Sequence, residues 1–197
     1  MKPTEQIKGK ILELNKKYMT NIEDYDFWNE HIKLVVNNAL KLADKFGADK
    51  EIVELGALLH DIALVSRDTN IIDHLMVKEK HHETGAEIAV KMLREINYPE
   101  EKIERVRKCV LHHRSSKNST SIEETCVADA DILAHFDNLP MLFECVFLLK
   151  KMNLVDGRES IKKSLEKDFN DLSEETNADF SDRYEMIIDV LFGGYEK

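Results

Sequence analysis

The sequence has few residues that form tight turns. Only seven glycines and three prolines occur in 197 residues. A many-stranded sheet needs frequent turns, so this scarcity argues against an all-β sandwich. A chain of this size buries roughly 70% of its unfolded surface, which is enough for a real core. The sequence therefore predicts an all-α fold in a single domain over residues 1–197.

Cysteine and positive charge are also scarce. The three cysteines, Cys109, Cys126 and Cys145, are odd in number and form no CxxC pair. This usage is typical of a reducing compartment, and we expect a cytoplasmic protein. Lys and Arg total 28 against 38 Asp and Glu, which gives a formal net charge of −10. The negative electrostatic field of such a chain opposes binding along a nucleic-acid backbone, so we expect no nucleic-acid partner.

Long apolar stretches are missing as well. The most apolar segment, Leu139 to Leu149, is interrupted by Glu144 and is shorter than the roughly 20 residues that a bilayer span needs. The N-terminal segment alternates charged and apolar residues, which favours an amphipathic helix over a signal peptide. We therefore expect neither a membrane span nor a secretory signal.

Apolar residues recur at helical spacing along almost the whole chain. We expect an N-terminal helix over residues 1–20, a core of about 28–136, and helices over 138–192 that pack around this core. Within the core, helices are expected from Trp28 to Gly47, Asp49 to Asp61, His82 to Ile96, Pro99 to His113 and Ile122 to Phe136. The C-terminal helices contain no histidine, which favours packing or a lid over a chemical role.

Two histidines lie on apolar helix faces, where buried imidazoles need partners. His31 shares its face with Val35 and Ala39, and His60 lies in the apolar run LLHDIALV. Asp61 follows His60 directly, and an unpaired carboxylate in such a run is costly unless a cation accompanies it. Imidazoles and carboxylates together are ligands typical of a divalent-metal site.

A second inward carboxylate is expected in the segment DADIL. Asp131 shares a helix face with Val127 and Ala134, but Asp129 is also acidic. Helix phase alone separates the two poorly, so both are candidates for the second carboxylate ligand.

The order of these residues resembles the H…HD…D signature of the HD-domain metal-dependent phosphohydrolases over roughly residues 28–136. The resemblance implies an HD-domain-like helical bundle with a metal site between helices, where a bound water attacks the phosphorus of a phosphate ester. The family places its aspartate directly before a pair such as IL, which favours Asp131 and leaves Asp129 a supporting or capping role. The implied first-metal ligands are His31, His60, Asp61 and Asp131, with Asp61 and Asp131 as the catalytic carboxylates.

Two histidine pairs suggest a second metal. HD proteins with two metals carry extra histidines where HHETGAEIA holds His81 and His82 and where LHHRS holds His112 and His113, with the aspartate of the HD pair, Asp61, bridging. Helix periodicity predicts that His82 and His113 face inward and that His81 and His112 face solvent. In some relatives both members of an HH pair bind metal, so His112 stays a candidate beside His82 and His113.

The expected cofactor is one or two divalent metal ions, among Mn, Fe, Co, Ni, Zn and Mg. Arg114, at the start of a Ser-rich loop, is a candidate phosphate contact through its planar fork, and Arg67 and Lys33 are weaker candidates. The alternative for all three is a solvated surface charge. His74 and His135 are expected to be structural.

The leading functional hypothesis is a phosphohydrolase that acts on a small phosphorylated metabolite, either a nucleotide or another phosphomonoester. A homodimer is the candidate assembly. The sequence has HDIALV where one branch of the family has HDIGK, and it lacks the GYP extension of another, which weakens an assignment to cyclic dinucleotides. Two alternatives remain open: a di-iron oxygenase of the HD type, and a non-catalytic HD module that binds a ligand.

Overall fold

The computed structural model describes residues 1–21, 26–66 and 80–194. Within these ranges every regular element is a helix, which confirms the prediction of an all-α fold. The helices are α1 (Pro3–Asn21), η1 (Trp28–Ile32), α2 (Lys33–Phe46), α3 (Lys50–Leu59), α4 (Ile62–Val65), α6 (His81–Glu95), α7 (Glu100–His112), η2 (Ser116–Asn118), α8 (Ile122–Asp137), α9 (Leu139–Glu144), η3 (Cys145–Leu149), α10 (Leu154–Asp171) and α11 (Glu174–Phe192).

Local sequence signals fix the ends of the core helices. Gly47 ends α2 in the left-handed region at φ 71°, where it donates its N–H to the Ala43 carbonyl. Asp49 begins α3 by accepting hydrogen bonds from the backbone N–H groups of Glu51 and Ile52. Pro99 precedes the first turn of α7. The expected boundaries of the core helices therefore agree closely with the structure.

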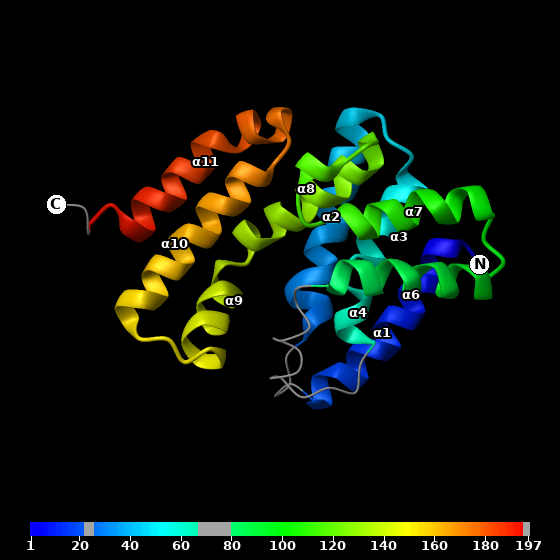
Figure 1. Ribbon diagram of the computed structural model, residues 1–197, viewed down its shortest axis with the longest axis horizontal. Coiled ribbons are helices and arrows are strands. Elements are labelled where there is room, and N and C mark those ends of the chain that lie inside the picture. The colour runs from blue at the N-terminus through cyan, green and yellow to red at the C-terminus, as the bar shows by residue number, and fades with distance from the viewer. Residues whose placement is uncertain (22–25, 67–79, 195–197) are drawn as a thin grey trace.

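The helices build two hydrophobic cores that share α8. One core is formed by apolar residues of α1, η1, α2, α3, α4, α6, α7 and α8, and the other by residues of α8 to α11. Val127 and Ala130 of α8 belong to the first core, whereas Ile132 and Phe136 belong to the second. Figure 1 shows the α10–α11 pair at one end of the molecule and the helices α1 to α7 at the other.

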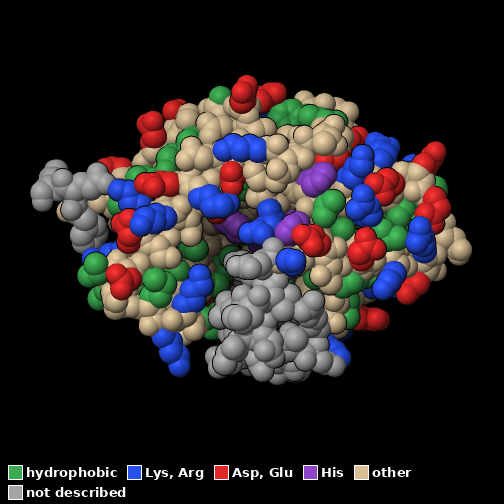
Figure 2. Space-filling view, in the orientation of Figure 1, with side chains coloured by type: hydrophobic (Ala, Val, Ile, Leu, Met, Phe, Trp, Pro, Cys, Tyr) green, Lys and Arg blue, Asp and Glu red, His purple; other side chains and the backbone are tan. Residues whose placement is uncertain are grey.

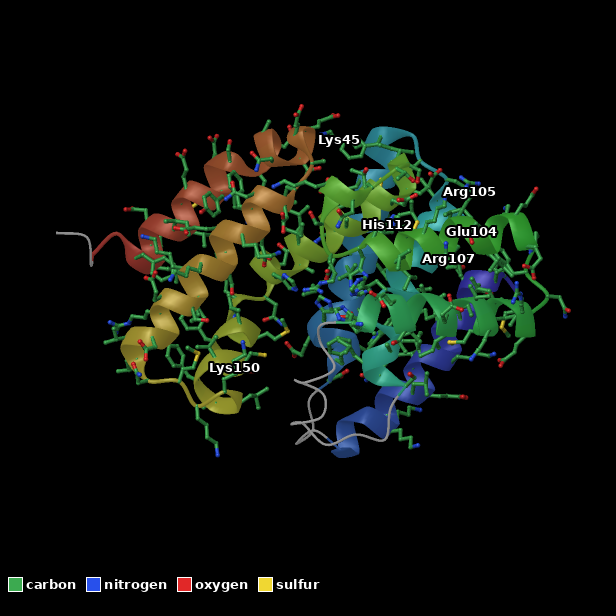
Figure 3. The ribbon with its side chains drawn as sticks, in the orientation of Figure 1. Lys45, Glu104, Arg105, Arg107, His112 and Lys150 are labelled. Carbon is green, nitrogen blue, oxygen red and sulfur yellow. The ribbon has the colours of Figure 1, made fainter. Side chains whose placement is uncertain are left out.

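Polar contacts tie the C-terminal helices to the rest of the fold. Asp129 of α8 is fully buried and accepts hydrogen bonds from the Ser173 N–H at 2.9 Å, the Ser173 hydroxyl at 2.5 Å and the Thr176 hydroxyl at 2.6 Å. Lys45, at the end of α2, pairs with Glu175 and Asp179 of α11, and Figure 3 shows it beside that helix. The start of α11 is thereby fixed against α8 and α2.

Close packing of α3 places its C-terminal end inside the bundle. A Cβ atom on Gly56 would lie 2.7 Å from Cβ of Cys109 on α7 and 3.0 Å from a methyl group of Val127 on α8. The absence of a side chain at this position lets the three helices approach closely. The residues that follow, His60 and Asp61, are buried as a result.

In the described part of the chain, a bilayer crossing by one straight helix is ruled out by length and apolar character. The segments Ile122–Asp137 and Leu139–Leu149 reach the required length and composition only together, as a pair bent by 78°.

Candidate metal centre

Six buried side chains from separate parts of the bundle meet at one place. Their positions follow from helix ends: α3 stops at Leu59, and Asp61 departs from helical geometry with φ −107° before α4 begins. This break lets the side chains of two consecutive residues converge. The cluster, here called the His–Asp cluster, consists of His31 from η1, His60 and Asp61 between α3 and α4, His81 from α6, His113 after α7, and Asp131 from α8.

Four of these side chains form a first group. The Nε2 atoms of His31 and His60 are 3.0 Å apart, and Nε2 of His31 is 3.1 Å from Oδ1 of Asp131. Oδ2 of Asp61 is 3.5 Å from the Nε2 atom of each histidine. Two ligands that each lie about 2.0 to 2.2 Å from one cation are separated by about 3 to 4 Å, so this spacing fits a shared metal ion.

The other oxygen of Asp61 faces a second group. Oδ1 of Asp61 is 3.1 Å from Nε2 of His81 and 3.7 Å from Nε2 of His113. The two Nε2 atoms are themselves 3.1 Å apart. Asp61 therefore directs one oxygen toward each group, which is the position of a carboxylate that bridges two metal ions.

The tautomers of two histidines test whether these residues fit a metal. Nδ1 of His60 donates to the Ala57 carbonyl at 2.8 Å, and Nδ1 of His113 donates to the Val110 carbonyl at 2.6 Å. When neutral, both rings therefore present the lone pair of Nε2 to the carboxylates. Oδ1 of Asp61 and Oδ1 of Asp131 are buried and have no hydrogen-bond partner among the described residues. Acceptors that face acceptors in a buried site fit a divalent cation.

The pKa values of His113 and of the two carboxylates favour metal-binding forms. Those of His31 and His60 are raised instead, because their contacts with Asp131 and Asp61 outweigh the lowering effect of burial. Burial lowers the pKa of His113 to about 4, so this imidazole is neutral near neutral pH. Burial raises the pKa of Asp61, but attraction to His60 and contacts with neighbouring imidazoles outweigh it and hold that pKa well below its ordinary value. Asp131 has a lowered pKa because its contact with His31 likewise outweighs burial. Both carboxylates are thus ionised near neutral pH.

The prediction that His81 faces solvent and His82 faces inward is wrong. His81 is buried in the cluster, whereas His82 is only partly buried and lies outside it. The face of α6 that meets the cluster passes through Gly85, four residues after His81, which packs against His60 and Ile62. Glycine does not register as apolar in a periodicity count, so the sequence did not reveal this face.

In the second histidine pair, His113 faces inward and His112 is the more exposed, as the helix phase predicts. His113 is buried in the cluster, and His112 is half-buried at the end of α7, where Figure 3 labels it. Nδ1 of His112 makes a 2.7 Å contact with a carboxylate oxygen of Glu124 on α8. His112 and His82, both candidate metal ligands by sequence, are therefore not brought into the described metal-binding groups.

The two aspartates of DADIL occupy different environments. Asp131 lies in the cluster, whereas Asp129 is used entirely by the hydroxyl and N–H donors described above and by the Ser116 hydroxyl. His135, expected to be structural, lies one turn after Asp131 and stacks on His31 with ring centroids 5.6 Å apart and an interplanar angle of 15°. In the sequence, the spacing of four residues between Asp131 and His135 was the signal that could have placed His135 beside the cluster.

A pocket of about 430 Å³ lies beside the second group. Arg114, a candidate phosphate contact by sequence, lines it, and so does Lys167 of α10, which the sequence did not single out. The full lining is His82, Glu83, Leu111, His112, Arg114, Ser115, Asn118 and Lys167. Figure 2 shows histidine side chains in the central hollow between Lys and Arg side chains. Lys33 is exposed at the start of α2, and Arg67 and His74 lie outside the described residues.

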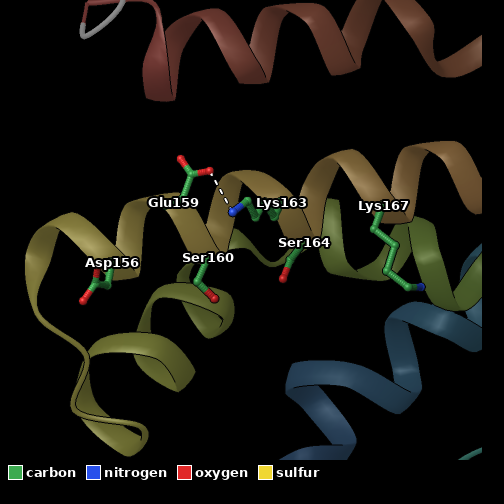
Figure 4. A pocket seen from close by; sticks show the side chains of 6 residues that line it. All are labelled: Asp156, Glu159, Ser160, Lys163, Ser164 and Lys167. Atoms are coloured by element: carbon green, nitrogen blue, oxygen red, sulfur yellow. Dashed lines mark ion pairs between the residues drawn. The ribbon is translucent and has the colours of Figure 1, made fainter.

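Lys167 also lines a second pocket of about 420 Å³ along α10, together with Asp156, Glu159, Ser160, Lys163 and Ser164. Figure 4 shows these side chains along one side of the helix, with Lys167 at one end. Nζ of Lys167 is 2.6 Å from a carboxylate oxygen of Asp171, and Nζ of Lys117 is 3.5 Å from the other oxygen. Helix α10 therefore brings Lys167, paired with Asp171, to the edge of the site.

Comparisons with known proteins agree with this fold. The chain resembles a crystal structure described as a predicted HD superfamily hydrolase from an uncultured Thermotogales bacterium, with 21% identity, a TM-score of 0.59, and coverage of 95% of this chain and 88% of that chain. It also matches the HD domain of the L. monocytogenes phosphodiesterase PgpH in complex with cyclic-di-AMP, with 18% identity, a TM-score of 0.47, and coverage of 94% and 98%.

A curated relative and a family model complete the comparison. A tRNA (cytidine(56)-2'-O)-methyltransferase of Picrophilus torridus is 29% identical over an alignment of 150 residues, and the match covers 68% of this chain and 39% of the relative. The chain thus spans about two fifths of the length of the curated relative that it matches. The model of the HD domain family matches residues 29–135, which is just over half of the chain and includes every residue of the His–Asp cluster. The chain belongs to the HD domain family.

Proposed function

We propose that this protein is a metal-dependent phosphohydrolase that cleaves a phosphate ester of a small metabolite, either a nucleotide or another phosphomonoester. The observation that carries the proposal is the placement of Asp61. Its two oxygens face two separate groups of buried Nε2 atoms, and Oδ1 has no hydrogen-bond partner among the described residues. A carboxylate in this position is suited to bridge two divalent cations.

The residues that would hold the metals divide as the two groups do. His31, His60 and Asp131 would hold one ion, His81 and His113 would hold the other, and Asp61 lies close enough to contribute to both. Bound divalent cations supply polarisation of phosphoryl oxygens and ionisation of water near neutral pH. The chain itself contributes the Nδ1 hydrogen bonds that orient His60 and His113, the neutral form of His113, and the two ionised carboxylates.

The surroundings of the cluster suit an anionic substrate. Two cations, Arg114 and Lys167, and one carboxylate, Glu83, line the adjacent pocket of a chain whose net charge is −10. Lys167 also pairs with Asp171. Burial and the nearby positive charge of Arg114 lower the pKa of His82 in the same pocket. A phosphoryl group that enters here would meet donors before it reaches the metal ligands.

Metal analysis followed by a phosphate-release screen tests this proposal. The purified chain is stripped with chelator, reloaded separately with Mn²⁺, Fe²⁺, Co²⁺, Ni²⁺, Zn²⁺ or Mg²⁺, and incubated with nucleotides and sugar phosphates. Asp61→Ala is measured beside Asp182→Ala, an exposed aspartate of α11. We expect Asp61→Ala to lose bound metal and phosphate release while its circular dichroism stays helical, and Asp182→Ala to match the parent.

Two results would contradict the proposal. A folded Asp61→Ala protein with full metal content would remove Asp61 from the site. Tightly bound iron with oxygen-dependent turnover and no phosphate release would instead support the oxidoreductase alternative.

A further inference from the structure

His135 lies at the open edge of the first group. Its Nε2 atom is 3.9 Å from Oδ1 of Asp131, and the candidate ligand atoms of His31, Asp131 and His135 all lie within 4.8 Å of one another. The His135 side chain is 33% exposed, whereas those of His31 and Asp131 are 4% and 11% exposed. His135 therefore borders both the buried ligands and the solvent.

The opposite side of the His135 ring is held by the C-terminal helices. Nδ1 of His135 is 3.0 Å from Oδ2 of Asp168 on α10. A carboxylate can only accept, so Nδ1 carries the proton, and the neutral ring presents its Nε2 lone pair toward Asp131.

The same arrangement recurs at two of the four histidines of the cluster. His60 and His113 donate Nδ1–H to the carbonyl three residues earlier and present Nε2 to carboxylate oxygens. His135 differs only in using a carboxylate from another helix as its acceptor. A carboxylate that holds the far nitrogen of a metal-binding imidazole is a frequent arrangement in metalloproteins and increases the basicity of the ligand.

We propose that His135 is a further ligand of the metal ion held by His31 and Asp131, and that Asp168 of α10 is the positioning residue that orients its ring. Asp131 and His135 are four residues apart on one face of α8, the spacing at which two ligands of a helix reach one cation. This inference rests on the metal centre of the proposed function, but it requires no particular substrate. The sequence predicts that α10 serves as packing or as a lid. Through Asp168, this helix would instead contact a metal ligand directly.

Metal affinity of the full chain tests the inference without reference to turnover. Metal-free parent, His135→Gln and Asp168→Asn are titrated with Mn²⁺, and free Mn²⁺ is followed by electron paramagnetic resonance. Glu166→Gln, which removes a charge from α10 two residues before Asp168, is the matched control. Co²⁺ absorption is recorded on the same variants, because its intensity responds to the number of ligands.

We expect His135→Gln to weaken one Mn²⁺-binding step by about ten- to a hundredfold and to change the Co²⁺ spectrum, since loss of a ligand or its supporting partner has effects of this size. Asp168→Asn should weaken the same step, Asp168→Glu should restore part of it, and Glu166→Gln should match the parent.

Two results would overturn the inference. If the parent binds Mn²⁺ and both variants bind it equally well with unchanged Co²⁺ spectra, His135 is a structural ion-pair partner of Asp131 and Asp168. If the parent binds no metal, the metal centre fails and this ligand fails with it. The parent titration separates these two failures. Should His135→Gln not fold, Asp168→Asn alone decides the matter, because it leaves the imidazole in place.

Discussion

At the scale of single residues, the geometry of the site depends on hydrogen bonds that orient two of its histidines through Nδ1. The backbone carbonyls of Ala57 and Val110 orient His60 and His113, each from three residues earlier in the chain. These acceptors belong to the ends of α3 and α7, so the rings are fixed by the same helices that deliver them. Residues placed in this way need little further ordering when a cation binds.

Arg114 should act on the substrate and not on the metal. An arginine cannot ligate a cation, but its planar fork can bind two phosphate oxygens at once. We expect Arg114→Ala to keep the metal content of the parent and to lose about 1.5 to 3 kcal/mol of transition-state stabilisation, or roughly ten- to a hundredfold in kcat/KM. The measurement is steady-state phosphate release on a substrate found by the screen.

Two companion variants sharpen this test. Arg114→Lys should recover only part of the loss, because lysine keeps the charge and forfeits the fork. Arg107→Ala is the matched control, since Arg107 lies on α7, where Figure 3 labels it, and pairs with Glu104 of the same helix. A parent-like kcat/KM in Arg114→Ala would make Arg114 a solvated surface charge and leave the substrate to the metals and Lys167.

The sequence predicted the site residues whose neighbours on the same helix are apolar, and it missed the site residues without such neighbours. Each of the predicted residues lies on an apolar helix face or in an apolar run, and all meet in the cluster: His31, His60, Asp61, His113 and Asp131. The sequence misplaced His81 because its face of α6 continues through Gly85. Lys167 could not be assigned to the site from the chain alone, because only the docking of α10 brings it there.

At the scale of helices, hydrogen bonds fix the first turn of α8, the helix that carries Asp131 and contributes to both cores. The Glu124 carboxylate in its first turn accepts hydrogen bonds from the Thr120 N–H and hydroxyl, both at 2.9 Å, and from the Ser121 hydroxyl at 3.2 Å. The Ser121 hydroxyl in turn accepts from the Glu124 N–H, as in a capping box. Contact with His112 completes the set.

Glu124→Gln should destabilise the metal-free protein at neutral pH by about 2 kcal/mol, because an amide cannot accept all of these hydrogen bonds. Burial raises the pKa of Glu124, but the contacts with His112 and Thr120 outweigh it and lower that pKa below its ordinary value of 4.5. The stabilisation by the carboxylate is therefore complete above pH 4.5 and is lost as pH falls through the folded-state pKa.

Urea unfolding of parent and variant from neutral pH to about pH 3 measures this difference. We expect the gap between the two free energies of unfolding to narrow below pH 4.5. Glu101→Gln, in the exposed first turn of α7, is the control and should change stability little at any pH. A gap that stays constant with pH would mean that the Glu124 charge contributes nothing beyond the shape of its side chain.

At the scale of the whole molecule, the His–Asp cluster joins elements that are distant in the sequence. Its candidate ligands come from η1, the α3–α4 junction, α6, the end of α7 and α8, which together span His31 to Asp131. The first hydrophobic core surrounds these ligands, and α8 links that core to the second. A cation bound here therefore connects most of the bundle, whereas the unfolded chain offers no comparable set of ligands.

Metal removal should consequently lower the stability of the entire fold. A ligand that binds only the folded state stabilises it by about 2.7 kcal/mol when its free concentration is a hundred times Kd. For a chain of this size each kcal/mol shifts Tm by about 2 to 4 °C, so one occupied site predicts a rise of roughly 5 to 10 °C. Differential scanning calorimetry of the stripped and Mn²⁺-loaded parent measures this shift, and Asp61→Ala, which lacks the bridging carboxylate, should show almost none. If the parent binds Mn²⁺ but melts at the same temperature with and without it, the ion is held by groups that the unfolded chain offers equally well, and the buried cluster is not its site.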